Sequence, residues 1–289
     1  MYAPSFDYYR ARSVADAHQL LAAHPGAKLL AGGHSLLPLL KLRLAAPPAL
    51  VDIGRIPELR GIARQGDEIR LGALTTHAEL AASPELRNAA TALADAAAMV
   101  GDPAVRNRGT IGGNIAHADP ASDLPTVLVA LDARIVATGS GGERTIPADQ
   151  FFTGIMTTAL AEDEIVTAIE VPASGRGHGS AYEKFSHPAS RYAVLGVAAW
   201  VAVSNGTCSA ARVALGGLLP NARRAGSVER ALIGKALDED AIAAAADQVA
   251  ADLGNDVAGD IYASAEYRRA MAPVFTKRAL ASAAARALR

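Results

Sequence analysis

The sequence contains a single cysteine, Cys208, among 289 residues. One cysteine excludes an internal disulfide, and it cannot supply the set of thiolates that usually holds an iron–sulfur cluster. No spacing of His and Cys residues predicts a zinc site either. If this chain takes part in redox chemistry, it therefore needs an organic cofactor, and any metal centre must lie on another chain.

Aromatic residues, net charge and long apolar runs are also scarce. Aromatic residues make up 4% of the chain and the formal net charge is -1, so no basic field predicts binding to nucleic acid. The longest apolar run, Ala193–Val203, has eleven residues, fewer than the roughly 18 that span a bilayer. It predicts a buried strand and no transmembrane segment. Because Met1–Asp7 lacks the basic and apolar regions of a signal peptide, we expect a cytoplasmic protein.

Two glycine pairs stand out in this background: Ala31-Gly32-Gly33-His34-Ser35 and Thr110-Ile111-Gly112-Gly113-Asn114. Without Cβ atoms, adjacent glycines let backbone N–H groups approach a ligand, and such loops form nests for phosphate oxygens. Neither pair has the spacing of a Rossmann turn or a P-loop. The alternative is that these glycines only form ordinary turns. If both segments are nests, they predict a clamp that holds a pyrophosphate from two sides.

Local patterns predict the surroundings of these pairs. A strand over 27–30 and a helix from Ser35 to about Arg43 place the first pair before a helix N-terminus, which favours an anion. We expect helices over 13–23 and 85–99 and hairpins over 61–74 and 134–147. The second pair falls in a long segment over 101–123, which predicts an irregular functional loop.

The second half of the chain predicts a different organisation. Residues 173–179 are the best linker candidate. Strands over 182–185, 193–203 and 209–215 come next, and helices over 227–233, 238–253 and 263 to about 288 follow them. Strands followed by helices predict a separate α+β domain.

Longer runs around both pairs carry a family resemblance. Leu36–Arg43 and Val105–His117 resemble the FAD-binding medium subunits of the molybdenum hydroxylases, above all the carbon monoxide dehydrogenase medium subunit. The FAD module of xanthine dehydrogenase is similar. The resemblance covers essentially the whole chain and implies an α+β protein. A two-subdomain FAD-binding domain of the vanillyl-alcohol-oxidase (PCMH) type would occupy 1–175, split into about 1–57 and 58–175. A C-terminal domain with a small antiparallel sheet and helices would occupy 176–289.

The resemblance also implies the residues around a non-covalent FAD. The two glycine segments would hold the pyrophosphate, Asp123 and Lys184 would contact the flavin, Val166 would contribute its backbone, and Tyr192 would pack beside the isoalloxazine. Taken alone, Asp123 also fits a helix N-cap, Lys184 a solvated strand lysine and Tyr192 a strand-end tyrosine. The predicted cofactor-binding residues are Ala31, Gly32, Gly33, His34, Ser35, Thr110, Ile111, Gly112, Gly113, Asn114, Asp123, Val166, Lys184 and Tyr192. No residue is predicted as a general acid, base, nucleophile or metal ligand.

The function that the resemblance implies is electron transfer. A large partner would hold the molybdenum cofactor, a small partner would hold [2Fe-2S] clusters, and FAD on this chain would pass electrons to an external acceptor. A dimer of heterotrimers is implied. The substrate stays open among carbon monoxide, an N-heterocycle, an aldehyde and an aromatic acyl thioester. Two alternatives remain: a self-contained FAD-dependent oxidase of the vanillyl-alcohol-oxidase type, and a non-enzymatic anion-binding module.

Overall fold

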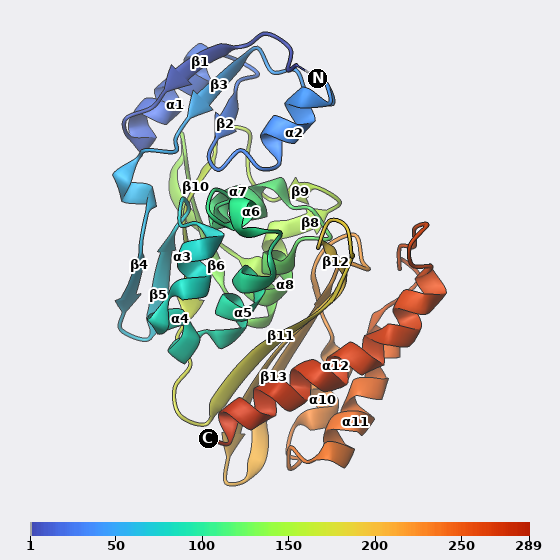
Figure 1. The fold of residues 1–289 in the computed structure, drawn as a ribbon. Coiled ribbons are helices and arrows are strands. Elements are labelled where there is room, and N and C mark those ends of the chain that lie inside the picture. The colour runs from blue at the N-terminus through green and yellow to red at the C-terminus, as the bar shows by residue number, and fades with distance from the viewer. Residues whose placement is uncertain (1) are drawn as a thin grey trace.

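The computed structural model describes residues 2–289, and its first subdomain is a three-stranded parallel sheet in the order β1-β3-β2, drawn in blue in Figure 1. Helix α1 begins where predicted, because the Ser13 side chain accepts a hydrogen bond from the Asp16 amide as an N-cap. Strand β2 leads into the first glycine pair. The elements are β1 (Asp7–Arg10), α1 (Val14–Ala23), β2 (Lys28–Leu30), α2 (Leu36–Lys41) and β3 (Ala49–Asp52).

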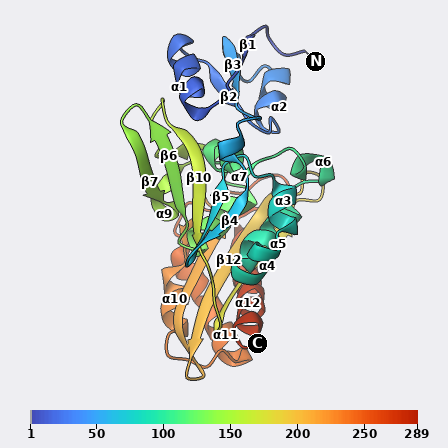
Figure 2. The same ribbon diagram turned by 90° about the vertical axis from the view of Figure 1, so that its left-hand side faces the viewer.

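The second subdomain contains a five-stranded antiparallel sheet in the order β4-β5-β10-β6-β7, seen below the first sheet in Figure 2. Both predicted hairpins are confirmed, and β10 joins them by pairing with β5 and β6. Its strands are β4 (Ile62–Gln65), β5 (Glu68–Gly72), β6 (Arg134–Gly139), β7 (Gly142–Pro147) and β10 (Ile165–Pro172), with a small pair β8 (Phe152–Gly154) and β9 (Thr157–Thr158) nearby. A short 3-10 helix, Pro57–Leu59, connects the two subdomains.

The helices of this subdomain correct two predictions. The single helix expected over 85–99 is broken at Ala90, where φ is -150° and ψ is 54°. The segment over 101–123 is not an irregular loop, since it contains α6 and α7, each begun by a capping side chain, Asp102 and Thr110. The helices are α3 (His77–Ala82), α4 (Pro84–Ala89), α5 (Thr91–Met99), α6 (Pro103–Arg106), α7 (Ile111–His117), α8 (Asp123–Ala130) and α9 (Ala148–Phe151).

The C-terminal part is an antiparallel sheet in the order β11-β12-β13-β14, followed by helices as predicted. The strands are β11 (His178–Ser186), β12 (Ala193–Ser204), β13 (Thr207–Gly216) and β14 (Arg223–Arg224). The helices are α10 (Gly226–Leu232), α11 (Glu239–Asp247) and α12 (Ala265–Ala287), with a 3-10 turn over Gln248–Asp252.

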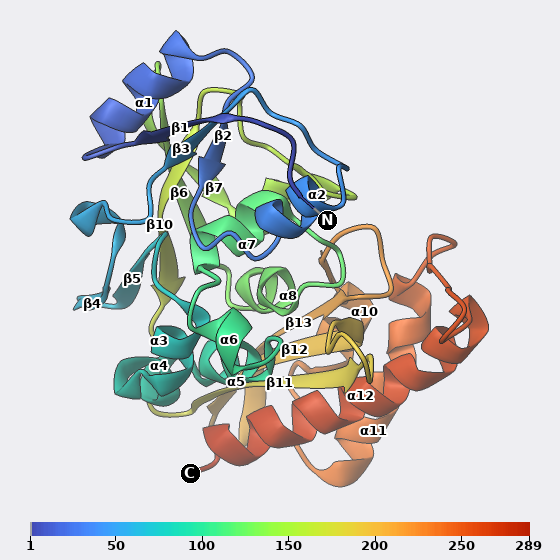
Figure 3. The same cartoon turned by 45° about the horizontal axis from the view of Figure 1, so that its top comes forward.

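This sheet is apolar on both faces because it lies between two layers of helices (Figure 3). Leu195 and Val197 of β12 pack with α10, α11 and α12 in one buried cluster. Ala198 and Trp200 of the same strand pack with α5 and α8 in the core of the second subdomain. The C-terminal sheet is therefore a wall shared with the second subdomain. Among residues 2–289, no helix is both long and apolar enough to cross a membrane.

Candidate functional site

A cavity of about 610 Å³ lies where the two subdomains and the β11–β12 turn meet. Its volume is within the range of small-molecule and cofactor sites. Residues of β2, which lies above α7 in Figure 1, line the cavity. Tyr192 of the β11–β12 turn also lines it. All of the predicted cofactor-binding residues line this cavity except Ile111 and Lys184. Ile111 is buried in the core instead.

The first glycine segment faces the cavity with free backbone donors. Within residues 2–289, none of the amides of Gly32, Gly33, His34 and Ser35 donates a hydrogen bond to a protein group. Gly33 has a φ of +78°, which explains why a glycine stands there. The Ser35 side chain makes no capping hydrogen bond, although the residue precedes α2. The segment thus offers oriented N–H groups and a hydroxyl to a ligand.

The second glycine segment is not a loop, and its amides are used inside the protein. It forms the first turn of α7, where Gly113 N donates to Thr110 Oγ1 (3.2 Å) and Asn114 N donates to Thr110 O (2.9 Å). Gly112 N donates to Ala73 O (2.8 Å) and Ile111 N to Thr75 O (3.0 Å). The expectation that this segment forms a second nest of backbone donors is therefore wrong.

Close packing explains one glycine in each segment, Gly32 and Gly112. A Cβ on Gly32 would lie 2.2 Å from the carbonyl oxygen of Arg108, so the first segment touches the backbone just before the second segment. A Cβ on Gly112 would lie 2.6 Å from the Cβ of Ala73. Gly113 is different, because it is exposed and its Cβ would meet only Thr110 Oγ1 at 2.9 Å and the Ala31 Cβ at 3.8 Å. Gly113 keeps a space open beside Ala31.

His77, which the sequence did not single out, contacts the backbone at Gly109, just before the second glycine segment. It is 3% exposed, lies within the capping box between Thr76 and Glu79, and its amide donates to Gly109 O (3.0 Å). Burial, with His34 and Arg106 nearby, lowers the pKa of His77 to about 4. Its ring is therefore neutral at neutral pH. The side-chain Nδ1 is buried without a hydrogen-bond partner among the described residues. The capping-box spacing Thr-x-x-Glu predicts the helix start, and nothing in the sequence separates this histidine from others.

Asp123 and Lys184 form a buried ion pair at the base of the cavity. Asp123 is the first residue of α8, with Ser122 as N-cap, so the N-cap alternative for Asp123 is wrong. Its Oδ2 accepts from Lys184 Nζ (2.9 Å) and its Oδ1 from the Tyr182 hydroxyl (2.7 Å). Burial raises the pKa of Asp123, and both partners counteract part of that rise. The alternative of a solvated strand lysine is also wrong for Lys184, since its side chain is 1% exposed.

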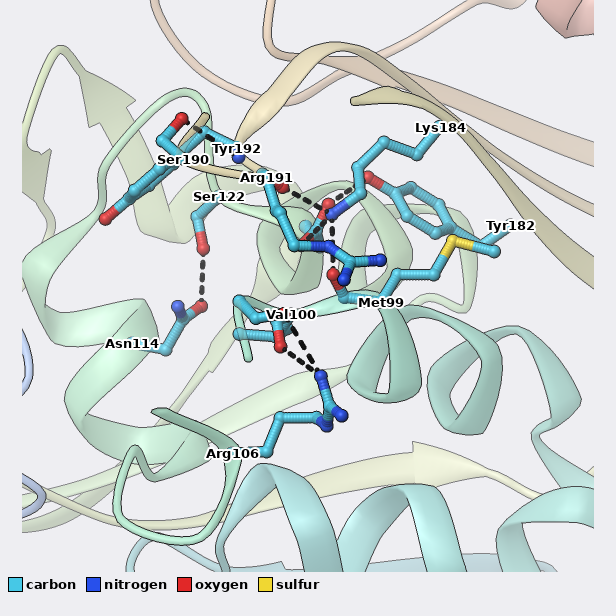
Figure 4. A network of polar contacts seen from close by, with 12 residues as sticks. Met99, Val100, Arg106, Asn114, Ser122, Tyr182, Lys184, Ser190, Arg191 and Tyr192 are labelled. Atoms are coloured by element: carbon cyan, nitrogen blue, oxygen red, sulfur yellow. Dashed lines mark hydrogen bonds and ion pairs between the residues drawn. The ribbon is translucent and has the colours of Figure 1, made fainter. Parts of the chain in front are cut away.

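Tyr192, Val166 and Asn114 complete the wall. The Tyr192 side chain is 43% exposed at the cavity mouth, and burial of the rest of its ring, with Asp119 and Asp123 nearby, raises the pKa of its phenol. Asn114 lines the cavity, and its Oδ1 accepts from the Ser122 hydroxyl (2.8 Å), a contact drawn in Figure 4. Within residues 2–289, no group of three His, Cys, Asp or Glu side chains is placed to hold a metal ion.

Comparison with known protein families gives matches over both halves of the chain. Residues 4–174 match the family described as the FAD binding domain in molybdopterin dehydrogenase. Residues 180–283 match the CO dehydrogenase flavoprotein C-terminal domain.

Similar proteins cover nearly the whole chain. It is 45% identical to the carbon monoxide dehydrogenase medium chain of Hydrogenophaga pseudoflava, over 99% of both chains. It is 41% identical to the 6-hydroxypseudooxynicotine dehydrogenase complex subunit alpha of Paenarthrobacter nicotinovorans, over 98% of this chain and 96% of the relative. The solved structure of carbon monoxide dehydrogenase from Hydrogenophaga pseudoflava contains a chain that superposes with a TM-score of 0.94 at 46% identity, over 99% of both chains.

Proposed function

The chain belongs to the family of FAD-binding medium subunits of molybdenum hydroxylases, and on that premise we propose that it carries electrons from a partner's iron–sulfur clusters through FAD to an external acceptor. It is a flavoprotein subunit of the oxidoreductase type, as its carbon monoxide dehydrogenase relatives are. The observation that carries the proposal is the cavity where the two glycine segments meet, with unpaired amides on one side.

The residues that line the cavity fit FAD. The unpaired amides of residues 32–35 and the Ser35 hydroxyl would hold the pyrophosphate, since oriented backbone dipoles bind phosphate without a lysine. The Gly113 face would let the pyrophosphate lie close to α7, with the Thr110 hydroxyl beside it. Val166, Asp123 and Tyr192 would surround the isoalloxazine. Cys208 is buried in the C-terminal sheet and does not line the cavity, which supports non-covalent binding.

When bound, FAD supplies the electron-accepting and electron-donating ring of the site. The residues of this chain bind and orient it, and they hold no proton poised for transfer. Asp123 is fixed by Lys184 and Tyr182, and the ring of His77, which lines the cavity, is neutral at neutral pH. Tyr192 lies at the cavity mouth, where it would restrict the access of water and acceptors to a bound flavin ring. This arrangement favours electron transfer over hydroxylation within this chain.

The proposed partner chains rest on the relatives of this chain, which are named as chains or subunits of larger enzymes. We propose a large partner with the molybdenum cofactor and a small partner with the [2Fe-2S] clusters. Relatives named for different substrates, carbon monoxide and 6-hydroxypseudooxynicotine, share the full length of this chain at 45% and 41% identity. Such conservation of length and fold across substrates is expected if the substrate is oxidised on another subunit.

Spectra and turnover of the purified protein test this proposal. We expect the complex, purified together with its partner chains, to show the visible absorption of bound flavin. Acid precipitation should release intact FAD, with no flavin left on the protein. FMN in the supernatant, or flavin on the precipitate, would contradict the assignment of a non-covalent pyrophosphate cofactor.

Expression of this chain alone separates the subunit from a self-contained oxidase. Without its partners, the chain should oxidise no substrate of the complex. Direct reduction of its flavin by such a substrate would favour the oxidase alternative.

A further inference from the structure

Every donor of the Lys184 ammonium is taken by a protein acceptor (Figure 4). Nζ donates to Asp123 Oδ2 (2.9 Å), to Met99 O (2.9 Å) and to Arg191 O (2.8 Å). An ammonium group has three N–H donors, so no donor is left for a ligand. Lys184 also does not line the cavity. These contacts replace the predicted contact between Lys184 and the flavin.

The three acceptors belong to three separate walls of the cavity. Met99 ends α5 and leads directly into Val100 and Gly101, which line the cavity, and Arg106 Nη1 donates to both of their carbonyls. Asp123 begins α8. Arg191 belongs to the β11–β12 turn, next to Tyr192. One buried cation therefore joins the α5 end, the α8 start and the turn at the cavity mouth.

The Lys184 contact is one of the ties between the β11–β12 turn and the rest of the protein, and another is Ala193 N, which donates to Ala121 O (3.0 Å). The turn is closed within itself by His187 N donating to Tyr192 O (2.8 Å) and Arg191 N donating to His187 O (2.8 Å). Arg191 has a φ of +60°, a left-handed conformation that is unfavourable for a residue with a side chain. Its side chain is exposed. The Lys184 contact with the Arg191 carbonyl holds this strained residue to the protein interior.

We propose that Lys184 is the positioning residue that fixes Tyr192 over the cavity through the Arg191 carbonyl. Without the ammonium, the turn opens and the flavin ring becomes more accessible to acceptors. The effect on acceptors rests on the proposed function, whereas the anchoring of the turn does not.

Trypsin digestion tests the hydrogen bond between Lys184 Nζ and Arg191 O, because the Arg191 carbonyl belongs to the peptide bond that trypsin cleaves. A hydrogen bond from a charged group is strong enough that losing it raises the open population of the turn about tenfold or more. In the FAD-loaded complex, Lys184→Met should therefore be cleaved between Arg191 and Tyr192 at least about tenfold faster than the unsubstituted protein. Mass spectrometry of the fragments identifies the bond. FAD content should stay unchanged while the rate of flavin reoxidation by the acceptor changes.

Tyr182→Phe is the matched control. It removes a hydrogen bond to the other oxygen of Asp123 and leaves all three Lys184 contacts in place. Its cleavage at Arg191 should match that of the unsubstituted protein. Faster cleavage in Tyr182→Phe, equal to that of Lys184→Met, would show that general loosening around Asp123 is the cause and would overturn the proposal.

A second variant removes the risk that Lys184→Met leaves an uncompensated buried carboxylate. Asp123→Asn combined with Lys184→Met removes both charges, so the fold should persist. Rapid cleavage at Arg191 in this double variant supports the proposal, and cleavage as slow as in the unsubstituted protein overturns it. Loss of FAD from Lys184→Met with a protected Arg191 bond would restore a direct flavin contact. If the unsubstituted complex held no FAD, the proposed function would fail while the cleavage comparison would still decide the anchoring.

Discussion

The two glycine segments have similar sequences, but their backbone amides differ in the structure. Residues 32–35 present amides without protein partners, whereas the amides of residues 111–114 are all bonded within the protein. The first segment is a loop that offers donors. The second is a helix start that offers a surface without side chains, so that a ligand can lie close. A pair of adjacent glycines therefore does not by itself identify a nest, because glycine also serves where two backbones meet.

The largest expected effect tests the contact between the two segments. Gly32→Ala places a Cβ 2.2 Å from the carbonyl oxygen of Arg108, which is backbone and cannot move aside cheaply. We expect the free energy of unfolding to fall by about 3 kcal/mol, and FAD to be lost as the segments separate. Chemical denaturation with flavin quantification measures both.

Gly141→Ala is the control for Gly32→Ala, since a Cβ on Gly141 meets nothing within 4 Å. It should change stability by less than about 0.5 kcal/mol. If Gly32→Ala were as stable as Gly141→Ala, the two segments would not be packed as described.

Substitutions at Gly112 and Gly113, the neighbouring glycines of the second segment, should have different effects. Gly113→Val should keep the fold, because the group nearest to its Cβ is the Thr110 hydroxyl at the end of a side chain. The valine would fill the space beside Ala31, so FAD affinity should fall at least about a hundredfold, or about 2.7 kcal/mol. Flavin titration of the refolded protein measures this.

Gly112→Ala should behave in the opposite way. Its Cβ would lie 2.6 Å from that of Ala73 in the core, so stability should fall before any specific loss of FAD affinity.

Full FAD occupancy in a well-folded Gly113→Val protein would contradict the placement of a pyrophosphate on α7.

A pH dependence distinguishes the segments because only the second rests on His77. The pKa of His77 falls from 6.5 to about 4 on folding. As the pH falls below the unfolded value, the unfolded chain binds a proton that the folded chain does not, so stability is lost progressively between about 6.5 and about 4. Between about pH 7 and pH 5 this loss amounts to about 2 kcal/mol.

Denaturation at both pH values, compared between the unsubstituted protein and His77→Leu, isolates this contribution. The difference in stability between the two pH values should be smaller in His77→Leu by about 2 kcal/mol. Identical pH profiles would mean that the His77 ring is hydrated and ionisable in the folded protein.

The sequence predicted most of the sheets because their determinants are local. Hairpin turns at Gly66 and Gly142, both with positive φ, locate β4–β5 and β6–β7 correctly. The broken helix at Ala90 was missed because no Gly or Pro marks it. The helix α7 was missed because its glycines have poor helix propensity, and the packing of Gly112 against Ala73 becomes visible only in three dimensions.

The site was predictable in its location and less so in its roles. The sequence runs around both glycine pairs that resemble the family contain residues that line one cavity. They do not show which amides are free, because that depends on whether a distant backbone such as residues 73–77 lies alongside. Lys184 was misjudged for the same reason, since its acceptors come from residues 99, 123 and 191 and none is close enough in sequence to read as a partner.

The smallest effect compares the hydroxyl of each segment. Thr110 Oγ1 caps α7 by accepting from Gly113 N, so Thr110→Val should lower the free energy of unfolding by about 1 kcal/mol. Ser35 makes no capping bond, so Ser35→Ala should leave the stability of the ligand-free protein within about 0.5 kcal/mol while FAD affinity falls about tenfold. Thermal unfolding without FAD and flavin titration measure the two quantities separately. If Ser35→Ala cost as much stability as Thr110→Val with unchanged FAD affinity, the first segment would be a structural cap like the second. If Ser35→Ala lowers only the FAD affinity, the Ser35 hydroxyl serves to bind the ligand and not to cap α2, like the amides of residues 32–35 beside it.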